Sequence, residues 1–345
     1  MTRIVTRSLM TVVAAVVVVA AAAALPPDAE TFLRNARFTD AELQTLAAGQ
    51  VIARADSGSS GGELMSVGAV RVRTPRAQTA AYYGQMISYV DGQVTLAFGK
   101  FSNPPVLDDA KGLSLDQKEI DALRSCKPGD CDLRIGGAGI AAVRQSIDWK
   151  APDAAARAQA AVRQALVNYV TAYLQRGDEA LVTFADTQKP VSLTDEWRAI
   201  VSNSPQLRQY APALTDYLLQ YPKATLPGAK DVFYWIKENY GLKPVISVVH
   251  GVIYQAPDRP DRTTVVQKQI YASHYYDASL AVATLFDGEE NGKPTTVIVY
   301  ANRSRGDLLK GGFGGLRQKV ARDQAKSATI DTLQTIQTQL EKARP

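Results

Sequence analysis

The sequence predicts an α+β protein. Runs rich in β-branched and aromatic residues occur in roughly the first hundred residues and again between residues 245 and 304. Residues 113–240 lie between these two groups and carry mostly helical periodicity. A final helical pattern covers residues 316–343. With 46% hydrophobic residues, the chain can bury a substantial core.

The chain begins with the pattern of a secretory signal peptide. Arg3 and Arg7 precede an apolar run from Leu9 to Leu25, whose end is rich in alanine. A basic start, an apolar stretch and small residues near its end are the parts of an export signal. We therefore expect residues 1–24 to be removed and the protein to be periplasmic or secreted. A retained N-terminal membrane anchor is the alternative, because the run approaches the length that spans a bilayer.

The net charge gives no reason to expect nucleic acid as a partner. Loss of Arg3 and Arg7 with the signal would lower the formal net charge from +5 to +3. That charge is close to neutral for a chain of this length, whereas nucleic-acid-binding proteins concentrate basic charge.

The two cysteines predict a disulfide. Cys126 and Cys131 flank the residues Lys-Pro-Gly-Asp, and Pro128 followed by Gly129 suits the centre of a tight turn. Such a turn brings the flanking residues close enough for a disulfide. The bond is expected in an oxidising compartment, in agreement with export.

The N-terminal part predicts a helix, a hairpin, a second helix and a strand. Thr39 and Glu42 have the spacing of a capping box, and Gly49 is a suitable end for that helix. Thr74 precedes Pro75, which suits the first position of the next helix. The strands of this part are expected at residues 50–56, 63–73 and 93–101.

The middle and the last third differ in their periodicity. Residues 153–177 place apolar side chains along one helical face, and Pro212 and Pro222 break or end the helical segment that begins near residue 204. Four strands of an antiparallel meander follow, at residues 245–255, 264–276, 278–286 and 295–304.

This order of elements resembles the START-like helix-grip superfamily, in which a curved antiparallel sheet grips a terminal helix. The resemblance rests on the order of elements in residues 39–99 and 245–345. It implies a cavity for an apolar or lipid-like molecule between the sheet and the C-terminal helix. The expected organisation is an N-terminal part of the domain (residues 25–106), a helical insertion with the disulfide turn (residues 107–240) and a C-terminal part (residues 241–345).

A cluster of histidine and tyrosine side chains on the last strands is the candidate site. His250 lies among aliphatic neighbours, so it needs a hydrogen-bond partner or a place beside a cavity. The candidate ligand-binding residues are His250, Tyr254, Tyr271, His274 and Tyr276. An acid–base pair, with Asp277 orienting His274 and raising its pKa, is the catalytic alternative. The non-functional alternative is a histidine satisfied by the backbone.

Other chemistry finds little support in the sequence. His250, His274 and Asp277 lack the short spacing of metal ligands, so no metal site is expected. The glycine-rich stretches around Gly136 and Gly312 lack the further residues of nucleotide-binding motifs, so no cofactor is expected either.

A basic segment near the C-terminus suggests a second kind of partner. Between Arg303 and Lys326 the chain has seven basic residues and two aspartates. Such a segment could touch an anionic membrane surface, or it could be a solvated helix face.

The sequence therefore leads to three hypotheses of function. The leading one is an exported, non-enzymatic binding protein for an apolar or lipid-like molecule. The second is a cofactor-independent enzyme that uses His250 and His274. The third is an envelope interaction protein that docks a partner through its helical middle.

Overall fold

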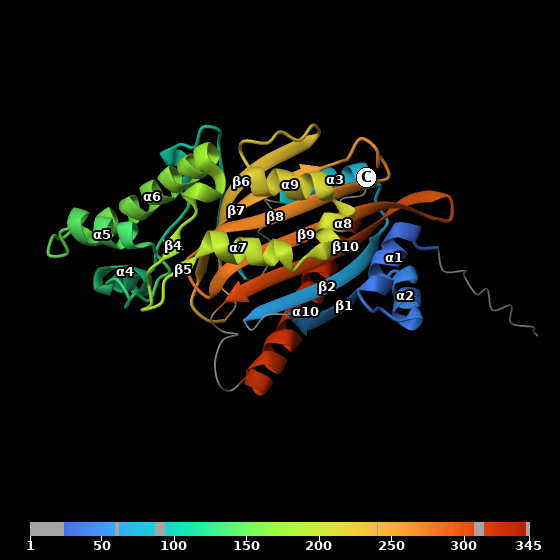
Figure 1. The fold of residues 1–345 in the computed structure, drawn as a ribbon, viewed down its shortest axis with the longest axis horizontal. Coiled ribbons are helices and arrows are strands. Elements are labelled where there is room, and N and C mark those ends of the chain that lie inside the picture. Colours follow the sequence, from blue (N-terminus) through green and yellow to red (C-terminus); the bar gives the residue numbers. More distant parts are fainter. Residues whose placement is uncertain (1–23, 59–61, 87–93, 240, 307–313, 343–345) are drawn as a thin grey trace, which may run out of the picture.

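A computed structural model describes residues 24–58, 62–86, 94–239, 241–306 and 314–342 (Figure 1). All but the last residue of the predicted signal peptide lies outside the described residues. The helices are α1 (Pro27–Asn35), α2 (Asp40–Ala47), α3 (Arg76–Met86), α4 (Gln117–Ser125), α5 (Gly137–Ser146), α6 (Ala154–Arg176), α7 (Leu193–Ser202), α8 (Pro205–Tyr210), α9 (Pro212–Gln220) and α10 (Gly314–Lys342), with short 3-10 turns η1 (Leu107–Ala110) and η2 (Gly177–Ala180).

Eight strands of the described chain form one antiparallel sheet in the order β1-β2-β10-β9-β8-β7-β6-β3. The strands are β1 (Ile52–Ser57), β2 (Glu63–Val72), β3 (Thr95–Phe101), β6 (Ala229–Glu238), β7 (Val245–Tyr254), β8 (Arg262–Ala272), β9 (Tyr276–Glu290) and β10 (Lys293–Gly306). Two short strands, β4 (Thr183–Phe184) and β5 (Val191–Ser192), pair separately. The predicted α+β class is confirmed, and a large antiparallel sheet with a C-terminal helix is consistent with a helix-grip kind of fold.

Strand β6 corrects the sequence prediction, which placed its residues in the helical middle. The segment from Val232 to Ile236 is apolar on both faces: Phe233 and Trp235 join one core cluster, while Tyr234 joins another. A strand buried on both faces shows no polar alternation, and a short apolar run of this kind does not distinguish strand from helix. In the structure β6 pairs with β3 on one side and β7 on the other.

Helix α10 covers one face of the sheet. Leu333, Ile336 and Leu340 pack in one core cluster with residues such as Val70 and Ile298. Figure 1 shows the helix behind the sheet, passing under β1 and β2. Residues that alternate with Val70 and Ile298 along their strands therefore point to the opposite face.

The opposite face is covered by two separate groups of helices. The first group is α1 and α2, whose Leu33 and Leu46 pack against β2, β9 and β10 in a core cluster that includes Val299. The second group is α7, α8 and α9, which cross the front of the sheet in Figure 1. Trp197 and Leu218 bring this second group onto β7, β8 and β9.

Helices α4, α5 and α6 lie together at one end of the sheet (Figure 1). Buried ion pairs connect this helical part to the strands. Lys237 of β6 donates to Glu119 of α4 at 2.5 Å, and the side chains are 6% and 5% exposed. Arg134, in the segment before α5, pairs with Asp277 of β9 at 2.6 Å. Buried charges require such partners, because leaving one unpaired costs several kcal/mol.

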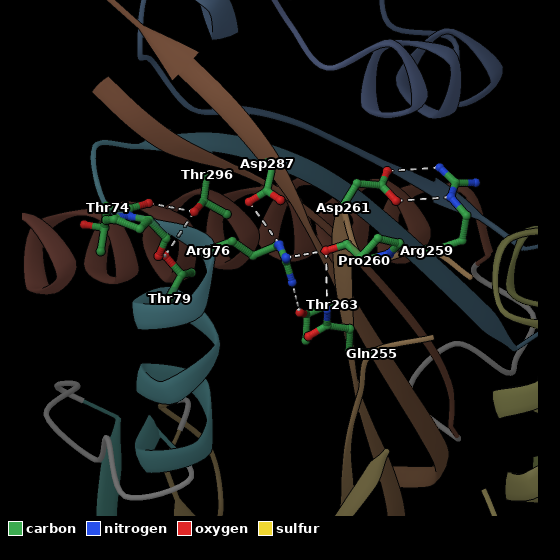
Figure 2. A network of polar contacts seen from close by, with 11 residues as sticks. Thr74, Arg76, Thr79, Gln255, Arg259, Pro260, Asp261, Thr263, Asp287 and Thr296 are labelled. Carbon is green, nitrogen blue, oxygen red and sulfur yellow. Dashed lines mark hydrogen bonds and ion pairs between the residues drawn. The ribbon is translucent and has the colours of Figure 1, made fainter. Parts of the chain in front are cut away.

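Helix α3 is attached to the sheet at its first turn. The guanidinium of Arg76 donates to the hydroxyl of Thr263 at 2.7 Å and lies 3.0 Å from the carboxylate of Asp287 (Figure 2). Beside it, the hydroxyls of Thr79 and Thr296 are 3.2 Å apart, and Thr296 donates to the carbonyl of Thr74. These contacts join α3 to β8, β9 and β10.

Two local predictions are confirmed. Thr39 and Glu42 form a capping box at the start of α2. Cys126 and Cys131 form a disulfide with their Cα atoms 4.4 Å apart, and Gly129 in the predicted turn has a positive φ of 77°. A disulfide is typical of an extracellular location. Within the described residues, every helix is either too short or too polar to cross a membrane.

Candidate functional site

His250 lies at the centre of a buried aromatic and polar cluster. Its imidazole has no exposed surface, and the rings of Phe233 and Tyr221 lie with their centroids 4.5 Å from its own. Its Nε2 is 2.8 Å from Oδ1 of Asp231, and its Nδ1 is 3.2 Å from the hydroxyl of Tyr173. Both ring nitrogens therefore have partners, one on β6 and one on α6.

The environment favours a neutral imidazole. Burial lowers the pKa of His250, and the nearby carboxylate of Asp231 only partly opposes this effect. Burial alone would raise the pKa of Asp231, but hydrogen bonds from His250 and Tyr217 hold it below its usual value. The tautomer with its proton on Nε2 donates to Asp231 and accepts at Nδ1 from Tyr173, so every polar group of this set is satisfied.

A buried lysine beside His250 was missed by the sequence analysis. Lys268 pairs opposite His250 across β7 and β8 and is only 1% exposed. Its ammonium binds the carboxylate of Asp178 and lies 4.4 Å from the ring centroid of Trp197. Burial lowers the pKa of Lys268 to about 8, against the opposing effect of Asp178. Only the alternation of β8, which puts Lys268 on a face with Ile270, could have indicated its burial.

The two histidines of the candidate cluster lie apart and have different hydrogen-bond partners. His274 lies two residues beyond the end of β8 and six residues along the chain from Lys268, which faces His250. Its Nδ1 is 3.2 Å from the hydroxyl of Ser273, and burial lowers its pKa. Asp277 pairs with Arg134 instead of orienting His274. The catalytic alternative has Asp277 raising the pKa of His274, whereas burial lowers that pKa and Arg134 from the helical middle binds the carboxylate of Asp277.

The three predicted tyrosines lie in three different environments. The hydroxyl of Tyr271 donates to the carbonyl of Arg134 at 3.1 Å, so this hydrogen bond joins β8 to the helical middle. Burial and the nearby Glu238 raise the pKa of Tyr276 to about 12. Tyr254 lines a small pocket, which is described below. Among the described residues, no group of histidine, cysteine or carboxylate side chains has the arrangement of a metal site.

A larger pocket of about 400 Å³ lies between the two groups of helices on the sheet face opposite α10. We call it the sheet pocket. Helix α1 forms one wall with Phe32, and α8 forms the other with Leu207 and Tyr210. The rings of Phe32 and Tyr210 meet with centroids 5.2 Å apart. Its floor includes Val67, Leu280, Val282, Thr284, Val299 and Ala301.

The strand register explains this floor. Thr284 pairs with Val299, and Val282 pairs with Ala301, which in turn pairs with Val67. These residues alternate with Leu285 and Ile298, which pack in the cluster of α10. The sequence predicted a ligand between the sheet and the C-terminal helix, whereas none of the described residues that line this pocket belongs to α10. The position differs because two helix groups leave a gap on the other face.

Charged groups stand at the edge of the sheet pocket. Arg54 binds Glu42 at 2.6 Å, and Arg303 binds the buried carboxylate of Glu63. The side chain of Arg303 is only 11% exposed. The prediction that Arg303 belongs to a membrane-facing basic surface is therefore wrong for this residue, which lines the pocket instead.

Comparisons with known proteins add little to this description. No protein-family model matches the chain, and no curated protein matches it. Among solved structures, norcoclaurine synthase from Thalictrum flavum, in complex with dopamine and hydroxybenzaldehyde, is similar at 12% identity and a TM-score of 0.21. The match covers 45% of this chain and 83% of the other. A similarity this low carries no argument about function, so the site must be judged from its own geometry.

Proposed function

We propose that the protein is an exported, non-enzymatic binding protein for an apolar or lipid-like small molecule, which it holds in the sheet pocket. The observation that carries the proposal is the volume of this pocket, about 400 Å³. Pockets of about 300–1,000 Å³ that are mainly apolar with a few polar groups are typical of small-molecule sites.

The composition of the pocket supports an apolar ligand. Leu280, Val282 and Val299 form a continuous apolar area across β9 and β10. Covering such area contributes about 25 cal/mol for each Å² removed from water. Phe32 and Tyr210, whose ring centroids are 5.2 Å apart, add aromatic surface to the walls.

The disulfide supports export. A covalent bond between Cys126 and Cys131 persists in an oxidising compartment, and the N-terminal pattern of residues 1–24 is that of an export signal.

The catalytic alternative receives less support from the same geometry. A general base must come within hydrogen-bond reach of its substrate. The imidazole of His250 has no exposed surface, and both of its nitrogens are engaged. Docking of a partner through the helical middle stays a prediction, which a pull-down comparing the mature chain with one lacking residues 113–240 would address.

Fluorescence titration with the neutral, apolar fluorophore phenylnaphthylamine tests the proposal. The mature protein should bind it with a rise in fluorescence. The variant Ala301→Phe adds a ring to the pocket floor and should weaken binding at least about tenfold, or about 1.4 kcal/mol. The matched control Ala160→Phe adds the same ring to an exposed position on α6 and should bind like the parent. Absence of binding, or equal binding by both variants, would show that the pocket is not the site.

A further inference from the structure

A second, smaller pocket adjoins the sheet pocket. It has a volume of about 120 Å³ and shares Tyr210, Ala211 and Thr264 with its larger neighbour. We call it the Arg262 pocket, after the most buried charged residue in its lining. The three shared residues make the two pockets neighbours along β8, so one elongated molecule can occupy both.

Arg262 is buried, and two of its nitrogen donors have no hydrogen-bond partner among the described residues. The residue is 6% exposed, and its Nη2 lies 3.2 Å from the carboxylate of Asp28 on α1. Its Nε and Nη1 have no hydrogen-bond partner among the described residues. A buried donor without a partner costs about 1–3 kcal/mol, so this guanidinium is set up to receive an acceptor.

The register places Arg262 at one end of the apolar floor. Arg262 pairs with Phe286 on β9, and two residues further along β8 Thr264 pairs with Thr284 of the sheet pocket. On the other side of β8, Thr264 pairs with Tyr254, which also lines the Arg262 pocket. The smaller pocket, with its guanidinium and its phenol, thus adjoins the apolar floor of the sheet pocket.

The charges of the lining favour an acidic group over a basic one. Five arginines and two aspartates line the two pockets together. Arg54, Arg303 and Arg259 already pair with carboxylates, so the buried donors left for a ligand in this lining are those of Arg262. Each of the two unpartnered nitrogens of Arg262, Nε and Nη1, can donate a charge-assisted hydrogen bond, which a carboxylate accepts more strongly than a neutral group does. An acid with a long apolar chain has both parts: a carboxylate that can bind the guanidinium and an apolar chain that can pack on the apolar floor.

We infer that the natural ligand is an apolar monocarboxylate, whose carboxylate binds Arg262 in the smaller pocket while its apolar part lies in the sheet pocket. This inference rests on the proposed function, because it names the ligand class of the same site. Tyr254 adds a hydrogen bond to the same carboxylate, which gives this predicted ligand-binding residue a role.

Competition against bound phenylnaphthylamine by decanoate and by decanol tests the inference. The two competitors share an apolar chain and differ in the head group. The parent protein should bind decanoate at least about tenfold more tightly than decanol, although the carboxylate loses more hydration. Arg262→Gln should remove this preference, because it should weaken decanoate far more than decanol; Asp28 keeps Arg259 as a partner in that variant. Arg198→Gln, which removes an exposed arginine of α7, should keep the preference.

The outcomes separate the two proposals. If phenylnaphthylamine and both competitors fail to bind, the proposed function itself is refuted. If decanol competes as well as decanoate, or if the preference survives Arg262→Gln, the binding protein stands and the carboxylate assignment falls. Should Arg262→Gln fail to fold, Tyr254→Phe serves in its place. It removes one hydroxyl and should weaken decanoate severalfold without affecting decanol, and an unchanged ratio would contradict the inference.

Discussion

Replacing His250 with glutamine should change how the stability of the protein responds to acid. The folded protein holds the imidazole neutral, since burial lowers the pKa of His250 below the ordinary value of about 6.5. The unfolded chain then binds a proton that the folded chain does not, so the free energy of unfolding falls as the pH drops below about 6.5. One such group contributes at most about 1.4 kcal/mol per pH unit. Between pH 7 and pH 5.5 the loss from His250 should reach at most about 1 kcal/mol, the limit for an imidazole that stays neutral in the folded protein.

Urea denaturation of the parent protein and His250→Gln at these two pH values measures the effect. Tryptophan fluorescence is a suitable signal, because Trp197 and Trp235 are buried. At pH 7 the variant should be the less stable protein, since it disturbs the hydrogen bonds to Asp231 and Tyr173. The difference between the two proteins should then narrow by up to about 1 kcal/mol at pH 5.5, because the variant has no proton to gain at this position. His274, whose pKa is also lowered, affects both proteins alike. A difference that stays constant, or widens in acid, would refute a buried neutral imidazole.

Three further substitutions test the packing. Lys237→Met leaves the carboxylate of Glu119 buried without its ammonium partner and should lower the free energy of unfolding by about 3–5 kcal/mol in urea denaturation; a loss below about 1 kcal/mol would mean that water reaches this carboxylate. Leu333→Ala removes a fully buried side chain of α10 and should lower the melting temperature through a loss of about 2–5 kcal/mol. Replacing Cys126 and Cys131 together with serine opens a short loop and should cost about 2 kcal/mol, as measured by urea denaturation, whereas an unchanged midpoint would show that the bond is dispensable.

The sequence predicted most of the elements because their signals are local. The capping box of Thr39 and Glu42, the turn between Cys126 and Cys131 and the strands of the last third each depend on residues close together in the chain. The break at Pro212 is also present, since α8 ends at Tyr210 and α9 begins at Pro212. These features depend little on what packs against them.

The candidate site could not be predicted to the same extent, because it depends on contacts between distant segments. Alternation correctly placed His250 on one face of β7, but the partners of its imidazole come from β6 and α6. Asp277 and His274 are close in sequence, yet Arg134 takes the carboxylate from a segment about 140 residues away. Periodicity shows that a strand has two faces, but the element that covers each face is decided by the tertiary structure.

The helical middle has a direct part in forming the sheet pocket. Helix α8 supplies one wall of the pocket, and it follows α7 directly in the chain. Helix α7 is fixed to β10 by the ion pair of Glu196 and Arg305, while Arg305 also lies 3.2 Å from Glu63 on β2. The same Glu63 binds Arg303 at the edge of the pocket. The buried carboxylate of Glu63 thus pairs both with Arg303 at the edge of the pocket and with Arg305, which binds α7. The helical middle therefore contributes one wall of the pocket, beside the wall from α1 and the floor from the sheet.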